Sequence, residues 1–389
     1  MIEWLLFAAV HHVADLTVLG GVAAVQALGA YLLWRRASSR ALRRAIITGT
    51  LLSYAVLLFG FLLGFNRIAV FFPRWWPTWG RGIAITWAFL SIFLTGGLLV
   101  SRRWMQIRKE YSPGRRAFLR TAETAMFCGP ALAIGYGVFI QRFDLRLREQ
   151  KLVFPDLPED LDGLRLVQLT DIHLSPFLSE NELARAVDMA NETKAHIALV
   201  TGDLITYSGD PLDACLRQLA RLKSDAGTFG CMGNHEFYAG AENYVEHNGA
   251  LLGLQFLRRR AVRLPFGKAT LNLAGVDYQR KAWPYLKFGR QLVEPGAFNV
   301  LLSHNPDVFP VAVEQGYRMT IAGHTHGGQV RVEILREDLN IARFLTPYVD
   351  GLYRRNESAI FVSRGIGTIG LPARLGAPPE VALLRLCRT

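Results

Sequence analysis

The stretch LRLVQLTDIH, residues 164–173, carries a short apolar run directly into an aspartate and a histidine. The same arrangement recurs four times further along the chain, where apolar runs lead into TGD at 201–203, GNHE at 233–236, LSHNP at 302–306 and GHTHGGQ at 323–329. Two stretches between the early runs, 180–192 and 212–223, have apolar residues at three- and four-residue spacing, which predicts helices. Alternating strands and helices predict an α/β domain, in which residues at the carboxyl ends of strands converge on one edge of the sheet.

The polar residues at these strand ends are of the kinds that bind divalent metals. Carboxylate, imidazole and amide oxygen are all ligands of hard-to-borderline cations. A single such residue is more often a side chain satisfied inside the fold, but five motifs with one ligand chemistry in one domain favour a metal site. The candidate ligands are Asp171, His173, Asp203, Asn234, His304, His324 and His326. This set is large enough for two metals that share one carboxylate, which is the usual clamp for phosphoester displacement.

The order D-x-H, G-D, G-N-H-E, H, G-H-x-H resembles the calcineurin-like metallophosphoesterase superfamily, and the likeness extends over about residues 164–386. A closer likeness, to a bacterial membrane-associated and often twin-arginine-exported subfamily, lies in TDIHLSP, NHEFYAG, LSHNPD and SRGIGTIGLPARLGAPPE. The resemblance implies a sandwich of two sheets flanked by helices. It also implies that Asp203 bridges two metals, of which one is held by Asp171, His173 and His326 and the other by Asn234, His304 and His324.

The resemblance further implies a reaction. A metal-activated hydroxide would attack phosphorus, and His235, which follows a ligand without joining the ligand set, would protonate the leaving-group oxygen or stabilise its charge. We expect a phosphodiester or pyrophosphate of an envelope or lipid-linked compound as the substrate. The two divalent metals can be manganese, iron or zinc, since imidazole and carboxylate suit all three. Arg364 and Arg374 either meet a second phosphate or a headgroup, or lie solvated at the surface.

Two other functions stay open beside this one. The domain could belong to a non-catalytic membrane receptor or scaffold, although a degenerate enzyme would be expected to have lost ligands and here none is missing. It could also be a hydrolase of the UDP-2,3-diacylglucosamine type, which would require the domain to face the cytoplasm. A transporter or channel that the domain regulates is disfavoured, because the apolar runs described below hold few polar groups.

The first 150 of the 389 residues differ in charge from the rest. They hold 18 Lys and Arg against 6 Asp and Glu, which accounts for the whole net charge of +12. This excess lies between long apolar runs instead of on the folded domain, which argues against a nucleic-acid partner. Four runs are long enough to cross a membrane, near 5–33, 45–65, 82–100 and 121–140. We therefore expect a four-helix transmembrane region at 1–141, a polar linker at 142–163 and the metallophosphoesterase domain at 164–389.

The connections between the runs predict the orientation in the membrane. The first holds five arginines and the third seven basic residues, against three arginines in the second. The positive-inside rule then places the first and third connections in the cytoplasm and the domain outside a bacterial inner membrane. GRRAFLR at 114–120 either resembles a twin-arginine signal or simply adds positive charge.

Three further features of the sequence carry no assignment. His11, His12 and Asp15 lie within the first apolar run and have no evident purpose. The four cysteines form no CxxC pair, so neither a zinc knuckle nor a disulfide framework is expected. The oligomeric state stays open.

Overall fold

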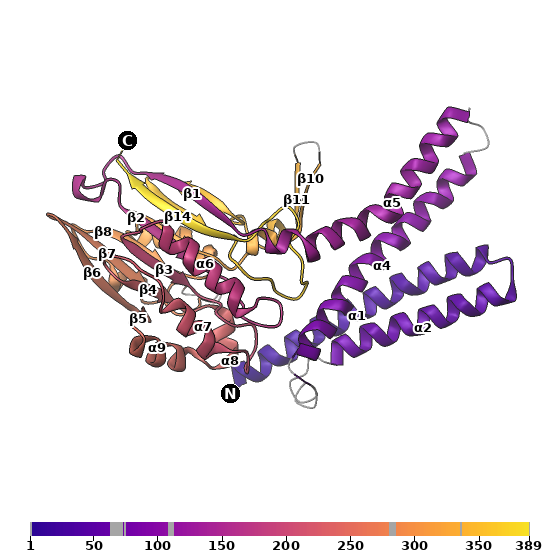
Figure 1. The fold of residues 1–389 in the computed structure, drawn as a ribbon, viewed down its shortest axis with the longest axis horizontal. Helices are drawn as coiled ribbons and strands as arrows, with labels where there is room; N and C mark the ends of the chain where they lie inside the picture. Colours follow the sequence, from indigo (N-terminus) through magenta and orange to yellow (C-terminus); the bar gives the residue numbers. More distant parts are fainter. Residues whose placement is uncertain are drawn as a thin grey trace. The chain divides into compact units, whose positions relative to one another are not determined.

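The computed structural model describes residues 2–62, 73, 75–107, 113–279, 285–334 and 337–388. The chain forms two compact units (Figure 1). One unit comprises residues 1–136 with 370–372, and the other comprises residues 137–369 with 373–389. The first is helical, whereas the second is built from β-sheets with helices packed on them.

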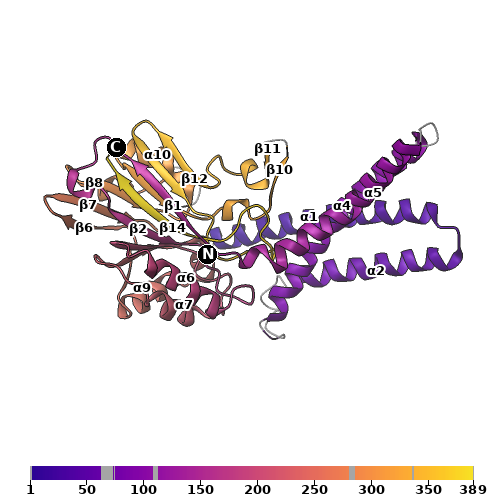
Figure 2. The ribbon, with the colours of Figure 1, turned by 45° about the horizontal axis from the view of Figure 1, so that its top comes forward.

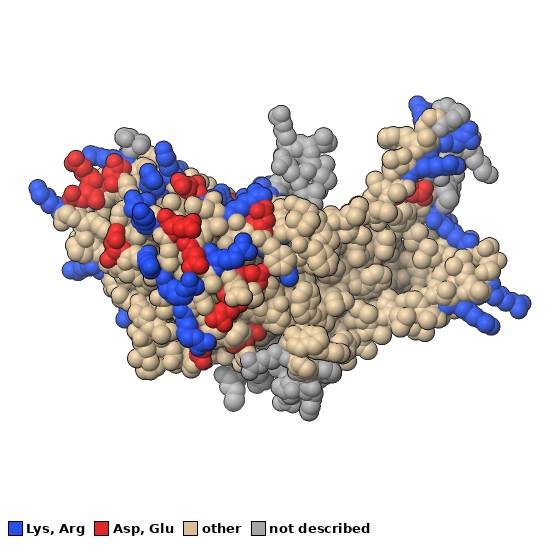
Figure 3. Space-filling model, viewed as in Figure 1, with Lys and Arg blue, Asp and Glu red and all other residues tan. Residues whose placement is uncertain are grey.

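The helical unit contains four long apolar helices (Figure 1). They are α1 (Ile2–Arg36), α2 (Arg40–Leu62), α4 (Trp75–Ile107) and α5 (Pro113–Phe139). Each holds most or all of a window that is long and apolar enough to cross a membrane, which confirms the four apolar helices expected from the sequence. These windows are 16–36, 40–60, 75–104 and 114–143. Figure 3 shows Lys and Arg gathered near the ends of these helices, with little charge along their length.

Polar side chains tie the apolar helices to one another. The Gln26 side chain on α1 donates a hydrogen bond to the Ser91 hydroxyl on α4, with 3.2 Å between the atoms. The Tyr54 hydroxyl on α2 donates to the Ala23 carbonyl on α1 at 3.1 Å. Such bonds matter between membrane helices, because lipid gives no hydrophobic force that drives helices together. The side chains of His11, His12 and Asp15 on α1 lie outside the described residues.

The second unit is a sandwich of two six-stranded sheets (Figures 1 and 2). In spatial order the first sheet is β1 (Arg146–Val153), β14 (Glu380–Cys387), β2 (Arg165–Leu169), β3 (Ile197–Thr201), β4 (Thr228–Cys231) and β5 (Leu254–Phe256). The second is β12 (Gly351–Arg355), β13 (Ser358–Val362), β9 (Met319–Ala322), β8 (Phe298–Leu302), β7 (Ala269–Gly275) and β6 (Arg260–Phe266). A separate two-stranded sheet pairs β10 (Arg331–Ile334) with β11 (Glu337–Asn340) in antiparallel fashion. This is the α/β architecture that the sequence predicts.

Parallel strands form the centre of both sheets, and this decides where the polar motifs meet. Strands β2, β3, β4 and β5 pair in parallel, as do β7, β8, β9 and β13. Helices α6 (Glu180–Glu192), α7 (Leu212–Leu219) and α9 (Glu242–Leu251) cover the outer face of the first sheet, and α10 (Phe309–Gln315) covers the second (Figure 2). Strands covered on both faces are mostly apolar, which is why they stand out in the sequence.

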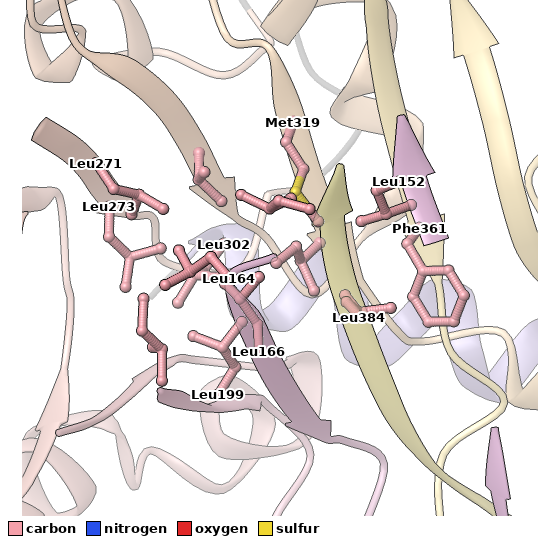
Figure 4. Close-up of a cluster of buried hydrophobic side chains, with 14 of the residues drawn as sticks. Leu152, Leu164, Leu166, Leu199, Leu271, Leu273, Leu302, Met319, Phe361 and Leu384 are labelled. Carbon is pink, nitrogen blue, oxygen red and sulfur yellow. The ribbon is translucent and has the colours of Figure 1, made fainter. Parts of the chain in front are cut away.

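The main core lies between the two sheets (Figure 4). On β2, Leu166 points into this core, whereas its neighbour Val167 packs under the helices. The same alternation on β3 turns Leu199 inward and Val200 outward. Alternate side chains of a strand face opposite sides of its sheet, so each central strand contributes to two apolar layers at once.

The expectation of a linker at 142–163 is wrong for residues 146–153, which belong to the first sheet. They form β1, which pairs in parallel with β14 from Arg146 opposite Glu380 to Val153 opposite Cys387. The strand escapes notice in the sequence because it is an edge strand with mostly exposed polar side chains. One of its apolar residues, Leu152, is nevertheless fully buried in the core. The sheet therefore begins well before residue 164.

Candidate metal centre

The polar motifs converge because each one directly follows a parallel strand. Asp171 and His173 follow β2, and Asp203 follows β3. The sequence GNHE follows β4 and begins the short helix α8 (Asn234–Ala239). The histidines of the second sheet follow β8, which leads to His304, and β9, which leads to His324 and His326. Both sheets thus place polar side chains at the carboxyl ends of their parallel strands, and we call this common end of the sandwich the edge.

The backbone at this edge is held in conformations that most residues avoid. Asp171, His173, Asp203, His324 and His326 all have positive φ, between 48° and 77°. A non-glycine residue in this region costs about 1–3 kcal/mol and persists only where the surroundings enforce it. Strain of this kind, repeated at five candidate ligands, indicates a site whose side-chain directions are fixed by the fold.

Two glycines let the carboxylates approach the backbone closely. A Cβ atom on Gly233 would collide with the Asp203 carboxylate, and one on Gly323 would collide with the Asp171 carboxylate. The sequence places each glycine immediately before a candidate ligand, Asn234 in one case and His324 in the other. Only glycine leaves room for this arrangement.

The side chains form three overlapping groups. Within each group the possible ligand atoms lie within 4.8 Å of one another, and the groups are Asp171, His173 and His326; His173, Asp203 and His235; and Asp203, His304 and His324. The first and third are subsets of the two ligand sets that the sequence suggests. An Asp203 carboxylate oxygen lies 3.5 Å from His173 Nε2 and 3.0 Å from His304 Nε2. Asp203 therefore stands between the two sets.

These residues fit a cation in their chemistry and in what they leave unsatisfied. The side-chain oxygen of Asn234 is buried and has no hydrogen-bond partner. Asp171 and Asp203 are buried carboxylates, with 0% and 1% of their surface exposed. Burying such groups without a charged partner costs several kcal/mol. A divalent cation would satisfy all three, and the mixed oxygen and nitrogen donors suit manganese, iron or zinc.

Electrostatics divides the histidines into two kinds. Burial lowers the pKa of His173 to about 3 and that of His324 to about 4. Burial would also lower the pKa of His304, but the adjacent Asp203 carboxylate outweighs it and raises this pKa to about 10. Burial would raise the pKa of Asp203, yet His304 holds it well below its usual range. With no cation bound, His304 and Asp203 thus carry opposite charges, while the other two histidines are neutral, the form in which histidine binds metals. A cation at the centre would take the place of the proton on His304 Nε2.

Backbone carbonyls orient two of the imidazoles. His304 Nδ1 lies 2.7 Å from the Thr201 carbonyl, and His235 Nδ1 lies 2.6 Å from the Thr206 carbonyl. A carbonyl only accepts hydrogen bonds, so in both residues the proton sits on Nδ1. The Nε2 atoms are then turned toward the centre, an arrangement that is typical of metal-site histidines.

Glu236 holds two of the ligand-bearing loops in place. Its buried carboxylate accepts hydrogen bonds from the backbone amides of Gly233, Asp203 and Leu204, at 2.7–2.9 Å. These amides belong to the loops after β3 and β4, so one side chain fixes two ligand loops against each other. Burial raises the pKa of Glu236, while the amide hydrogen bonds oppose that rise.

Arg374 differs from both alternatives that the sequence offers. It is fully buried, and its guanidinium donates to the carbonyls of Gly367, His326 and Arg364 at 2.8–3.0 Å. Burial lowers its pKa to about 10. Neither a headgroup nor bulk water reaches it, and it instead fastens the GHTHGGQ loop to the C-terminal loop. Arg364 is partly exposed and pairs with Asp350 at 2.8 Å.

Comparison with known proteins agrees with this geometry. Residues 164–328 match the family described as calcineurin-like phosphoesterase. The chain contains a calcineurin-like metallophosphoesterase domain. That domain holds every candidate ligand named above, and the residues matched end just after the GHTH motif.

Relatives of the metallophosphoesterase domain occur in membrane proteins. The chain is 29% identical over 278 residues to a "Transmembrane protein with metallophosphoesterase domain" from Danio rerio, which covers 67% of this chain and 62% of that protein. It is 28% identical over 270 residues to an uncharacterized metallophosphoesterase from Aquifex aeolicus, and the match covers 66% of this chain and 97% of that protein. It is also 28% identical over 276 residues to phosphodiesterase YaeI from Escherichia coli, and that match covers 70% of this chain and 98% of that protein. A solved dimetal phosphatase from Danio rerio is 12% identical with a TM-score of 0.33, covering 53% of this chain and 88% of that one.

Proposed function

We propose that the protein is a membrane-anchored phosphoesterase that uses two divalent metals to hydrolyse a phosphodiester or pyrophosphate bond of an envelope or lipid-linked compound. The observation that carries this proposal is the position of Asp203 between two groups of ligands. One metal would be held by Asp171, His173 and His326, and the other by Asn234, His304 and His324. When bound, such a metal pair supplies a nucleophilic hydroxide at neutral pH and offsets the charge that develops on phosphorus.

The chain's own residues supply orientation and a proton. Glu236 and the backbone carbonyls hold the ligands in place before a substrate arrives, so little reorganisation is needed during the reaction. His235 lies edge-on to His173, with 4.7 Å between the ring centres. Because its Nδ1 is engaged by Thr206, its Nε2 is the atom that would carry a proton to the leaving oxygen.

His235 has a second candidate role. It belongs to the group formed with His173 and Asp203, so it could act as a ligand instead of an acid. The sequence does not suggest this, because the resemblance places His235 outside the ligand set. Metal content distinguishes the two roles, since an acid can be removed without loss of metal.

The experiment that tests the function uses the full chain in detergent. The protein would be stripped with a chelator, reloaded with manganese, iron or zinc, and assayed with bis-p-nitrophenyl phosphate, p-nitrophenyl phosphate and phospholipids. We expect metal-dependent turnover that is faster for the diester than for the monoester. Two bound metals without turnover of any ester would favour a receptor or scaffold instead.

The orientation of the domain is the second part of the proposal. We place the domain outside a bacterial inner membrane, since the basic residues concentrate in the first and third connections. Reporters fused after Phe143, before β1 begins, test this. An alkaline phosphatase fusion should be active and a green fluorescent protein fusion dark. The reverse pattern would place the domain in the cytoplasm and favour nucleotide-linked lipids as substrates.

A further inference from the structure

Three aromatic side chains form a cluster beside the metal centre. Phe237 and Tyr238 come directly after His235 and Glu236 on α8, and Tyr278 lies three residues beyond the end of β7. Their ring centres are 6.0–6.3 Å apart. We call Phe237, Tyr238 and Tyr278 the aromatic rim. Its members come from both sheets of the sandwich, as the candidate ligands do.

The aromatic rim touches the centre at two points. The Tyr238 ring lies 5.8 Å from the His235 ring, and the Tyr278 ring lies 6.1 Å from the His324 ring. His235 is the residue that would protonate the leaving oxygen. A group attached to that oxygen would therefore lie against the rim as it departs.

The rim presents apolar surface to the surroundings. Phe237 is 42% exposed and Tyr238 is 40% exposed, whereas nearly all large apolar side chains of the central strands are buried. Aromatic rings offer flat faces that bind other rings by stacking and apolar groups by burial. Small-molecule sites commonly combine such surface with a few convergent polar groups, and here the polar groups are those of the metal centre.

We infer that the aromatic rim is the leaving-group subsite, and that it selects phosphodiesters whose leaving group carries an aromatic ring. This inference rests on the proposed function, because it uses His235 to mark the side from which the leaving group departs. Stacking of one ring on an aromatic side chain corresponds to roughly a 5- to 150-fold change in binding. An effect of that size is expected in KM more than in kcat, because the rim contacts the leaving group before and during the reaction.

The test compares two diesters that share one non-leaving group. One has a phenol as its leaving group, and the other has a fluorinated alkanol of the same pKa, so the chemistry of bond cleavage is matched. Full-length protein in detergent should prefer the phenyl ester. Phe237→Ala and Tyr238→Ala should raise KM for the phenyl ester by roughly 5- to 150-fold. They should leave KM for the alkyl ester nearly unchanged. Tyr238→Phe keeps the ring and should retain the preference.

Tyr244→Ala is the matched control. Tyr244 is 46% exposed and lies on α9, where its hydroxyl donates to Asp213 at 2.7 Å. Its loss should change neither KM nor kcat for either ester. Equal losses on both esters in the rim variants, or no loss on the phenyl ester, would overturn the inference.

A binding measurement separates this inference from the proposed function. Phenylphosphonate and methylphosphonate can be titrated by calorimetry into the metal-loaded full chain without any turnover. Tighter binding of phenylphosphonate, which Phe237→Ala abolishes, would support the subsite even in a protein that hydrolyses nothing. Equal binding of the two phosphonates would contradict the subsite even if diester hydrolysis were confirmed.

Discussion

The core between the two sheets and the edge at the strand ends both contain fully buried side chains, and they are opposite in chemistry. Leu166 and Leu199 in the core are 0% exposed, and so are Asp171 and His173 at the edge. The core is filled by apolar side chains that follow the two-residue period of their strands. The edge is filled by charged and polar groups on a backbone with positive φ. Burial alone therefore says nothing about which part of the fold stabilises it and which part serves a function.

The two regions contribute to stability with opposite sign. Each fully buried leucine stabilises the fold by roughly 1.5–3 kcal/mol. At the edge, backbone strain costs about 1–3 kcal/mol for each residue, and buried carboxylates add to that cost. The edge is tolerated because the parallel strands beneath it are anchored in the core, and a bound cation would reverse part of the cost.

The largest expected effect comes from Asp203→Asn. This change removes the charge of the carboxylate that lies between the two ligand sets, so we expect turnover to fall below detection and metal content to drop. Metal analysis and a diester assay on the full chain would measure both. Asp188→Asn is the control, since Asp188 is an exposed carboxylate that pairs with Arg221. Wild-type turnover with two metals in the Asp203 variant would show that the site is assigned wrongly.

His235→Ala should have the next largest effect. If His235 is an acid, the variant keeps both metals and loses roughly two to four orders of magnitude in rate. The loss should shrink for nitrophenyl esters, whose leaving groups need less protonation. His247→Ala, at an exposed histidine on α9, should behave as wild type. Loss of a metal together with rate would instead assign His235 to the ligands.

Much of this edge could be predicted from the sequence, because its signals are local. A buried strand that leads directly into Asp171 or into Asp203 carries its own evidence within about ten residues. The glycines that precede Asn234 and His324 add to that evidence. The central strands can be predicted in the same way, since strands covered on both faces are mostly apolar.

The features that the sequence does not predict depend on contacts between residues that are distant in the chain. Strand β1 is recognisable only beside β14, more than 200 residues later, because its own side chains are mostly polar and exposed. The burial of Arg374 depends on carbonyls of two loops that face it only after folding. Tyr278 joins Phe237 and Tyr238 through the meeting of two sheets, so no local pattern reveals the aromatic rim.

A third prediction compares the two buried regions directly. Leu384→Ala removes a fully buried side chain of the core and should lower the free energy of unfolding by about 2–5 kcal/mol. Removing the metals should lower it further, by about 2.7 kcal/mol for each metal that was present at a hundred times its dissociation constant. The two effects should add, because Leu384 pairs with Leu166, three residues before the end of β2 and its candidate ligands. Thermal unfolding of the full chain with and without chelator measures both.

The same melting experiment can contradict this account. Asp203→Asn should respond little to the chelator, because it has already lost its metals, whereas Leu384→Ala should respond as wild type does. If chelation leaves the wild-type melting temperature unchanged, the strained edge is stable without cations. The contrast between the two buried regions would then be one of composition only.

The smallest effect is expected away from both regions, at the start of α6. The Ser179 side chain accepts a hydrogen bond from the Glu182 amide at 3.3 Å, and the Glu182 carboxylate accepts one from the Ser179 amide at 2.7 Å. Ser179→Ala removes half of this capping box and should lower the free energy of unfolding by about 1 kcal/mol. Metal content and kcat/KM should stay at wild-type values, because α6 packs under the sheet and supplies no candidate ligand. Ser179→Asn retains an acceptor and should restore the stability. A change in kcat/KM that Ser179→Asn does not reverse would show that the edge is coupled to the helical layer, and that the two buried regions are not independent.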